Sequence, residues 1–424
     1  MFIHERDNWT DFTWDAAAVM DKTTEVYRAI GFLSGRLSAV GFDDIQAASA
    51  ESLAQSIVAS SVIEGIALDM DEVRSSVARK LGINIPNEKE PTHYVEGIVD
   101  MTMDAVFHYD RPLTEQRLFG WHSALFPNGK SGLYPITVGA YRTEPMEVVS
   151  GAMGRERIHY RAPEAERVGM EMQRFIEWFN NPSVAPSVTK SAIAHLWFVS
   201  IHPFDDGNGR IARALSDMVL SQMDKAPQRF YSLSMEISKE KQAYYRMLEH
   251  TQRGQGDITD WLLWYHDCVL HAVETANGLL SNVLNKVVFW SRHAQVSMSD
   301  RQRRILNLFL DGNNMKLTTK NWARLADVSM DTALRDIKDL EASGVLKACK
   351  GRVRDVSYSI VYSPTDELPF TDITLSENGK HTVISISYKG QSFTDTLSDV
   401  DATRLRQEEI TDADLAYKYF AYLL

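Results

Sequence analysis

The segment from His202 to Arg213 contains the side chains best suited to chemistry in this chain; it reads His-Pro-Phe-Asp-Asp-Gly-Asn-Gly-Arg-Ile-Ala-Arg. The imidazole of His202, with an ordinary pKa of ~6.5, can take a proton from a hydroxyl group at neutral pH. The carboxylate of Asp206 is a hard oxygen ligand that could hold Mg²⁺ against phosphates. Arg210 and Arg213 lie three residues apart, so on a helix both guanidinium groups can bind phosphate oxygens from one side. Because no cysteine lies here and no serine adjoins His202, the simplest chemistry is direct attack of a substrate hydroxyl on a metal-held phosphate.

Two predicted helices position these side chains. Apolar residues recur with helical spacing over 188–201, and Pro203 together with the glycines ends that helix. A second helix can begin at Asn208 or Gly209 and run to about Ser221. A glycine-rich turn that leads into a helix N-terminus is typical of an anion site, because its free N–H groups and the helix dipole both favour phosphate oxygens.

The motif His-Pro-Phe-x-Asp-Gly-Asn-Gly-Arg-x-x-Arg resembles the signature of the Fic family, and all the fixed positions of that signature are met. The usual reaction of the family transfers AMP from ATP to a Ser, Thr or Tyr hydroxyl of a protein. The resemblance implies that His202 is the catalytic base and that Asp206 is the Mg²⁺ ligand. It further implies that Gly207, Asn208 and Gly209 form a cradle for the phosphates. Arg210 and Arg213 would then clamp the β- and γ-phosphates. The plainer alternative is that His202 caps a helix and the arginines pair with surface acids.

A helix predicted over about 48–65 contains the sequence Ser60-Ser-Val-Ile-Glu64-Gly65. Ser60 and Glu64 share a helix face because they are four residues apart. The sequence resembles the inhibitory motif of the Fic family, which implies that Glu64 pairs with Arg213 and competes with the γ-phosphate of ATP. The alternative is a solvated acid before a glycine that ends the helix.

Two further regions acquire a role only through this resemblance. Strands predicted at Met146–Ser150 and Arg157–Arg161 form a hairpin within about 139–163, where the family has its flap, which holds a target peptide by strand addition. A helix predicted over 237–253 would place Tyr244, Leu248 and Gln252 against the nucleoside, although family members often have Asn at the last of these positions. These three residues could equally belong to the core.

The composition limits the possible classes of protein. The chain has 424 residues, enough for two or three domains, and a net charge of −12 that argues against a protein that coats nucleic acid or an anionic membrane. Two cysteines imply no disulfide framework, and neither a signal peptide nor a membrane-spanning run is evident, so we expect a cytoplasmic protein with no membrane partner. The aromatic residues of the stretch 9–14 are expected to pack the N-terminal end against the rest of the folded chain. This end resembles the region before the Fic core in one bacterial subfamily.

The segment after Ser299 resembles a winged helix-turn-helix domain. Helices are predicted over 300–310, 318–325 and 330–343, and a basic ribbon follows that contains Lys347, Lys350, Arg352 and Arg354. The third helix would be the recognition helix, but it carries several acids, namely Asp331, Asp336, Asp339 and Glu341. Binding of duplex DNA and contact with protein, including homodimerisation, therefore both remain open.

The predicted fold is mainly α: an N-terminal helical region (1–91), a Fic-type core with a β-hairpin flap (92–290), a winged helix-turn-helix domain (291–360) and a small α+β tail (361–424). The tail is expected to hold a hairpin over 382–388 and 392–396, followed by helices. The resemblance predicts a self-inhibited protein adenylyltransferase that uses Mg²⁺ and ATP and modifies a protein target, which could include itself, and that could also reverse the modification. The alternatives are a nucleotide-sensing transcription regulator that binds DNA and a Fic relative that uses another phosphate-containing donor.

Overall fold

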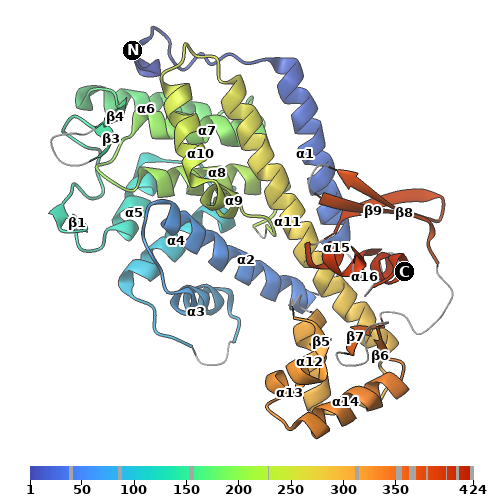
Figure 1. Ribbon diagram of the computed structural model, residues 1–424. Helices are drawn as coiled ribbons and strands as arrows, with labels where there is room; N and C mark the ends of the chain where they lie inside the picture. Colours follow the sequence, from blue (N-terminus) through green and yellow to red (C-terminus); the bar gives the residue numbers. More distant parts are fainter. Residues whose placement is uncertain are drawn as a thin grey trace. The chain divides into compact units, whose positions relative to one another are not determined.

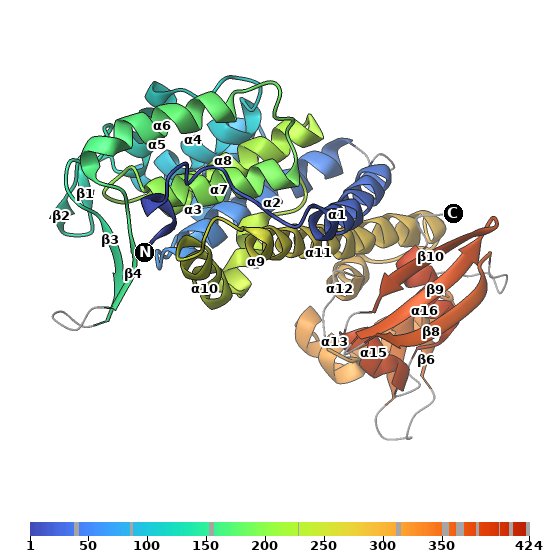
Figure 2. The same ribbon diagram turned by 90° about the horizontal axis from the view of Figure 1, so that it is seen from above.

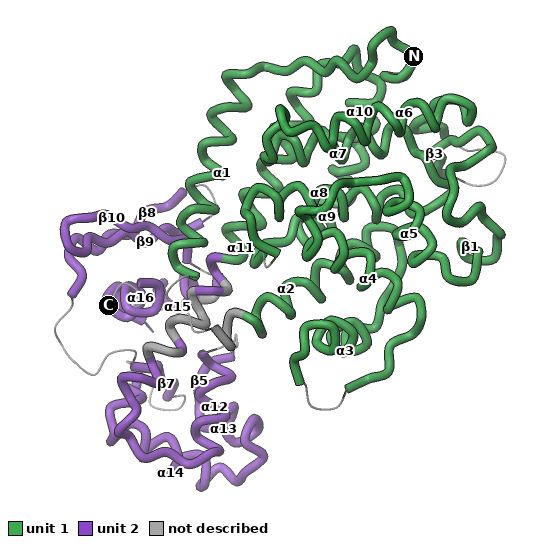
Figure 3. The backbone as a smooth tube through the Cα atoms, turned by 180° about the vertical axis from the view of Figure 1, so that it is seen from behind, with its two compact units in different colours: residues 1–276 green, residues 277–424 purple. Residues whose placement is uncertain are grey.

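A computed structural model describes residues 1–37, 42–84, 88–151, 157–227, 229–310, 315–349, 356–361, 369–378, 381–397, 399–406 and 410–420. The chain forms two compact units, residues 1–276 and 277–424 (Figure 3). The boundary falls inside one long helix, α11 (Thr259–Arg292). The mainly helical fold class predicted from the sequence is confirmed.

The first unit is a bundle of helices with two small hairpins at one side (Figure 1). The helices before the catalytic segment are η1 (Ile3–Glu5), α1 (Ala16–Leu37), α2 (Phe42–Ile63), α3 (Met70–Leu81), α4 (His93–Phe107), α5 (Glu115–Leu125) and α6 (Ala165–Phe179). The catalytic segment joins α7 (Val188–Ile201) to α8 (Asn208–Asp224). After it come α9 (Leu233–Lys239) and α10 (Lys241–Gln252).

Helices α7 and α8 form the centre of this unit, and each packs along the other. Every residue of α7 outside Thr189 is buried, as expected of a helix with apolar residues on all its faces. Ser187 caps the start of α7 through its side chain, which accepts a hydrogen bond from the Lys190 amide at 3.0 Å. The short connection between α7 and α8 is thereby held on two rigid helices.

Two helices differ from their sequence predictions. The helix with Ser60 begins at Phe42 rather than at about residue 48, and it ends at Ile63, one residue before Glu64. The single helix predicted over 237–253 is instead two helices that meet at Glu240, whose backbone leaves the helical region (φ −114°, ψ 32°). The break allows α9 to pack on α2 while α10 packs on a strand of the second hairpin.

The hairpins are both antiparallel and project from the same side of the unit (Figures 1 and 2). The first joins β1 (Lys130–Ser131) to β2 (Tyr134–Pro135). The second joins β3 (Glu147–Ser150) to β4 (Arg157–Arg161), with a register shift between Val148 and Val149. The tip of the second hairpin, residues 152–156, lies outside the described residues.

The aromatic residues at the N-terminal end dock as expected at two of three positions. Trp9 is 1% exposed and donates through Nε1 to Glu171 Oε2 at 3.2 Å. The rings of Phe12 and Trp197 meet edge to face, with their centroids 6.2 Å apart. Trp14 is 38% exposed, so the expectation that it also docks is wrong; the side chain faces solvent just before the cap of α1.

The second unit contains two small cores. The first belongs to α12 (Asp300–Leu310), α13 (Thr319–Ala326) and α14 (Met330–Ala342), with the antiparallel sheet order β5-β7-β6 made by Leu317–Thr318, Ser357–Ile360 and Leu346–Ala348. The second belongs to the sheet β10-β9-β8, made by Gln391–Thr396, His381–Tyr388 and Thr371–Asn378, with α15 (Asp399–Arg406) and α16 (Asp412–Phe420). The sequence prediction missed β8, because only Ile373 and Leu375 mark an alternating pattern there.

Among the described residues, no helix has the length and apolar character that crossing a membrane requires. The elements of the first core follow one another as helix, strand, helix, helix, strand and strand. This order is compatible with the winged-helix prediction, which stays a prediction. Three of its basic wing residues, Lys350, Arg352 and Arg354, lie outside the described residues.

Candidate active site

The loop between α7 and α8 is shaped by two left-handed residues and one clamping side chain. His202 has φ 52° and Gly207 has φ 85°, a conformation that glycine adopts without strain. The amide side chain of Asn208 accepts from the Phe204 amide at 3.0 Å and donates to the Phe204 carbonyl at 2.8 Å. Asn208 therefore holds the shape of the loop through its side chain, while its backbone begins α8.

Phe204 anchors this loop in the core. Its side chain is fully buried and stacks on the His122 ring, with ring centroids 4.2 Å apart. His122 in turn contacts the Asp206 carbonyl oxygen through Nε2 at 3.1 Å. Because a carbonyl only accepts, that nitrogen is the protonated one. This packing makes Phe204 a structural anchor of the loop.

We expect Phe204→Ala to lower the free energy of unfolding by about 3–5 kcal/mol, the usual cost of emptying a buried aromatic site. Urea unfolding followed by circular dichroism measures this value. Phe119→Ala is a suitable control, because that ring also contacts Phe204 but belongs to α5 rather than to the loop. A loss below about 1 kcal/mol for Phe204→Ala would show that the loop does not depend on this anchor.

His202 is placed and protonated as a base requires. Its Nδ1 lies 3.2 Å from the Val199 carbonyl oxygen, and since that oxygen can only accept, Nδ1 carries the proton and Nε2 has a free lone pair. Burial lowers the pKa of His202 to about 4, with smaller contributions from neighbouring groups. The ring is therefore neutral at physiological pH, with Nε2 able to accept a proton.

The lowered pKa has a consequence for the pH dependence of any reaction in which His202 is the base. A base acts when it is neutral, and a depressed pKa keeps it neutral to lower pH, so kcat/KM should stay level from neutral pH down to about pH 5 and fall only below that. A pH profile of kcat/KM under stable folding conditions measures this. An acidic limb centred near the ordinary value of ~6.5 would contradict the placement of His202.

Asp206 is the half-exposed carboxylate of the loop. It is 40% exposed, it accepts a short hydrogen bond from the Ser131 hydroxyl, and its Oδ1 lies 3.3 Å from Arg210 Nη2. Among the described residues, no three His, Cys, Asp or Glu side chains gather into a metal site. A single carboxylate suits Mg²⁺, which keeps waters and takes its remaining ligands from phosphates.

The two arginines are almost fully buried, each with 1% of its side chain exposed. Arg210 donates to the Tyr94 hydroxyl at 2.7 Å, and Arg213 donates to the Ser60 hydroxyl and carbonyl oxygens, each at 2.8 Å. One buried nitrogen of each, Arg210 Nε and Arg213 Nη1, has no hydrogen-bond partner among the described residues. A buried donor without a partner is costly, so these atoms fit an anion such as a polyphosphate.

A cavity of about 500 Å³ adjoins this end of the loop. It lies between α4, the first hairpin and the catalytic segment, and Tyr94, Lys130, Ser131, Asp206 and Arg210 are among its lining residues. No sequence pattern marks Tyr94 or Ser131, because their partners lie 116 and 75 residues away along the chain. The cavity leaves Asp206 accessible to a ligand, and Arg210 lies buried in its wall.

Glu64 lies directly against the second arginine. Its Oε1 is 2.7 Å from Arg213 Nη2, so Ser60 and Glu64 together engage one guanidinium group. A Cβ atom on Gly209 would come within 2.1 Å of that same carboxylate oxygen, so only glycine leaves room for it. The structure thus brings together the residues that the resemblance paired.

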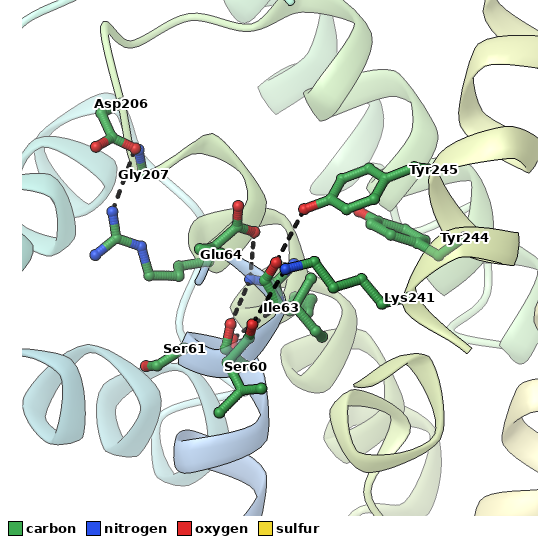
Figure 4. Close-up of polar contacts among 12 residues, drawn as sticks. Ser60, Ser61, Ile63, Glu64, Asp206, Gly207, Lys241, Tyr244 and Tyr245 are labelled. Carbon is green, nitrogen blue, oxygen red and sulfur yellow. Dashed lines mark hydrogen bonds and ion pairs between the residues drawn. The ribbon is translucent and has the colours of Figure 1, made fainter. Parts of the chain in front are cut away.

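The end of α2 is held by two residues of α10. The Tyr245 hydroxyl donates to the Ile63 carbonyl oxygen at 3.0 Å, and Lys241 Nζ lies 3.3 Å from the Val62 carbonyl oxygen. Figure 4 shows Glu64 between the loop at Asp206 and Gly207 on one side and Tyr245 on the other. Neither Lys241 nor Tyr245 has a role predicted from the sequence.

The three residues predicted to contact the nucleoside are buried. Tyr244 bonds through its hydroxyl to His195 Nε2 at 2.8 Å, and Gln252 Nε2 donates to Ser200 Oγ at 3.1 Å. Leu248 is 8% exposed between them on α10. These contacts favour the alternative of a core role, and binding of the nucleoside by these residues stays a prediction.

Comparison with known proteins identifies two regions of the chain. Residues 2–83 match a domain of unknown function, DUF4172, and residues 112–220 match the Fic/DOC family. A protein adenylyltransferase Fic of Drosophila erecta is 34% identical over 100 residues, which are 23% of this chain and 18% of that protein. One of Nematostella vectensis is 23% identical over 237 residues, 53% of this chain and 48% of that protein.

The chain thus matches no more than about half the length of these curated relatives. A crystal structure of a Fic family protein from Desulfovibrio desulfuricans G20 aligns with a TM-score of 0.49 at 18% identity, covering 82% of this chain and 97% of that one. The stretch that matches the family contains the whole loop with His202, Asp206, Arg210 and Arg213. This chain therefore contains a domain of the Fic/DOC family.

Proposed function

We propose that the chain is a protein adenylyltransferase that transfers AMP from ATP to a hydroxyl side chain of a protein and that Glu64 holds it inhibited. The observation that carries the proposal is the shared guanidinium group of Arg213. One of its nitrogens pairs with Glu64 at 2.7 Å, and another is buried without a partner among the described residues. The curated relatives named protein adenylyltransferase Fic support the type of reaction.

The proposed reaction uses the side chains as they stand. The acceptor hydroxyl loses its proton to Nε2 of His202, while its oxygen attacks the α-phosphorus of ATP. A new oxygen–phosphorus bond forms, the bond from the α-phosphorus to the bridging oxygen of the β-phosphate breaks, and pyrophosphate leaves. The pKa of His202, lowered by burial, keeps the ring neutral before this step.

The N-terminus of α8 and the two arginines would bind the triphosphate. Gly207 and Gly209 leave the backbone open at the start of α8, where N–H groups and the helix dipole favour phosphate. Arg210 and Arg213 would neutralise the charge that develops on the leaving pyrophosphate. Asp206 would hold Mg²⁺, which would polarise the phosphate oxygens as a Lewis acid when bound.

The hairpin β3–β4 would hold the acceptor. In the two-stranded sheet that the structure describes, each strand has one edge without a neighbouring strand. Such an edge can pair with an extended segment of another protein through main-chain hydrogen bonds. The acceptor hydroxyl would then lie at the loop with His202. The identity of this target, which could include the chain itself, is left to experiment.

Inhibition by Glu64 follows from competition for Arg213. A carboxylate and a γ-phosphate both need the same guanidinium nitrogens, and only one can bind at a time. With Glu64 in place, ATP binds weakly or with its α-phosphate out of line. The same carboxylate could orient a water molecule for the reverse reaction, in which AMP is removed from the modified protein.

Two isotope labels test the proposed reaction. The purified protein with Glu64→Ala is incubated with Mg²⁺ and ATP labelled at either the α- or the γ-phosphate. Covalent retention of the α-label but not the γ-label is expected, because AMP is transferred and pyrophosphate leaves. Retention of the γ-label would instead indicate phosphoryl transfer, and retention of neither would point to a separate target or to another phosphate-containing donor.

The rival proposal is a transcription regulator that senses a nucleotide and binds DNA. The order of elements in residues 300–360 favours a winged-helix domain, yet one wing cation, Lys347, is paired with Asp414 at 2.7 Å. The helix α14 exposes Met330 and Leu334, at 52% and 43%, which suits a protein contact better than phosphates. Salt-sensitive binding of duplex DNA that is lost with Arg352→Ala and Arg354→Ala together would support the regulator.

A further inference from the structure

The first residues of the chain are buried against the catalytic unit. Residues Phe2–Trp9, called here the N-terminal hook, contain Ile3 at 0% exposure, Trp9 at 1% and Phe2 at 9%. The proposed reaction assigns no role to this hook, although it lies within the matched domain of unknown function.

The hook packs on strand β4 of the second hairpin. The ring of Phe2 meets that of Tyr160 edge to face, with centroids 5.3 Å apart, and His4 Nδ1 lies 3.1 Å from the Tyr160 hydroxyl. Phe2, Tyr160 and Ala162 form a small apolar cluster of their own, and partly buried side chains from both strands surround it, namely Met146, Val148 and Ile158. The hook therefore covers the base of the hairpin rather than the bundle alone.

Tyr160 connects this cluster to the catalytic loop. Its hydroxyl donates to the Ser200 carbonyl oxygen at 2.7 Å, and Ser200 is two residues before His202. Since the single phenolic proton is used there, His4 must donate its Nδ1 proton to the Tyr160 oxygen. Burial lowers the pKa of His4, which keeps the ring neutral in this arrangement.

Helix α10 holds the hook and the same strand from the other side. The Arg253 guanidinium lies 4.9 Å from the centroid of the Phe2 ring and donates through Nη2 to the Ile158 carbonyl oxygen at 2.7 Å. Glu249 of α10 pairs with His159 and Arg157 of β4, each at 2.7 Å. Figure 2 shows the N-terminus beside the hairpin and close to α10.

The hairpin needs such support. A two-stranded sheet without further packing is marginally stable in water. Its strand β3 is mostly exposed, and the register shift after Val148 interrupts the ladder. The two ends of the hairpin are tied to the loop by Arg142, whose guanidinium donates to the carbonyl oxygens of Glu144, Pro163 and His202. The contacts with the hook and α10 add support along strand β4 itself.

We propose that the N-terminal hook is a positioning element that fixes the β3–β4 hairpin at the distance from His202 at which a bound acceptor hydroxyl can react. This inference rests on the proposed transferase function. Phe2 and His4 act through Tyr160 and touch neither ATP nor the acceptor. Two of the contacts that the domain of unknown function makes then act on the site: the hook acts on the hairpin, and Glu64, at the end of α2, acts on Arg213.

The test compares variants in the full chain carrying Glu64→Ala. Phe2→Ala removes the ring that covers Tyr160, and Trp14→Ala is the matched control, an exposed aromatic on the same N-terminal segment that does not pack on the hairpin. Hydrogen exchange is measured for the amides of β3 and β4 and, as an internal reference, for those of α7 and α8. Incorporation of α-labelled ATP into the protein itself is measured at several ATP concentrations.

We expect Phe2→Ala to speed exchange in the hairpin by about tenfold or more, with no change in α7 and α8. The maximal rate of self-labelling should fall by about tenfold, while the ATP concentration for half-maximal labelling stays within about twofold. Trp14→Ala should leave all three quantities unchanged. His4→Asn keeps a donor for Tyr160 and should label faster than His4→Ala.

Unchanged exchange in the hairpin with Phe2→Ala would overturn the proposal whatever the labelling shows. Faster exchange with an unaltered labelling rate would also overturn it, because the hook would then be structural only. If the parent with Glu64→Ala does not incorporate label at all, self-modification fails, and a separate target or another phosphate-containing donor is indicated. The exchange data still decide separately whether the hook fixes the hairpin.

Discussion

Replacing Glu64 with alanine should tighten the binding of ATP by about ten- to a hundredfold, the range expected when a hydrogen-bonded charge no longer competes for a buried guanidinium group. The reason is the 2.7 Å contact between Glu64 Oε1 and Arg213 Nη2. With that carboxylate gone, Nη1 and the N–H of Nη2 that faced Glu64 are available to the γ-phosphate, while Nη2 keeps its bond to the Ser60 carbonyl oxygen. The α-phosphate can then settle in line with the acceptor. Isothermal titration with a non-hydrolysable ATP analogue and Mg²⁺ measures the affinity.

Glu51→Ala is the matched control for this change. Glu51 lies on α2, the helix that Glu64 directly follows, and pairs with Arg74 at 2.7 Å. Its removal takes away the same charge and should leave the affinity for ATP unchanged. Equal affinity for ATP in the parent and in Glu64→Ala would contradict competition at Arg213.

Replacing His202 with alanine in the Glu64→Ala background should lower the rate of AMP transfer by about 10²- to 10⁴-fold, the usual contribution of a general base. ATP affinity should change little, because the described hydrogen bond of the His202 side chain is to the Val199 carbonyl oxygen and not to Arg210 or Arg213. A loss of rate with ATP affinity kept would assign His202 to the chemical step.

His122→Ala is the control, because it shows whether removing another histidine close to the loop also lowers the rate. His122 is buried, stacks on Phe204 and bonds to the Asp206 backbone. Its removal should therefore lower the stability of the protein but leave the rate of AMP transfer per folded molecule unchanged. A rate for His202→Ala within about threefold of its parent would remove it as the base.

The sequence predicted the loop and its flanking helices well because the information is contiguous. Helix α7 has the predicted bounds, and α8 begins at Asn208, as its glycine turn indicates. The pairing of Glu64 with Arg213 spans 149 residues and could be expected only through a resemblance. Periodicity alone places both residues on helices without bringing those helices together.

Contacts without a local signal were missed. Tyr94 and Ser131 meet the loop from two other elements, and no pattern around either residue distinguishes it from its neighbours. The break at Glu240 was also missed, because Lys239-Glu240-Lys241 contains no proline or glycine. Tertiary packing of α9 on α2 and of α10 on β4 decides the break there.

The most direct test of the account is the incorporation of α-labelled ATP into three purified proteins: the parent, Glu64→Ala, and Glu64→Ala with His202→Ala. We predict weak labelling of the parent, strong labelling of the single variant and loss of that label in the double variant. The same strong labelling in the single and double variants would contradict His202 as the base. Equal labelling of the parent and Glu64→Ala would contradict inhibition by Glu64.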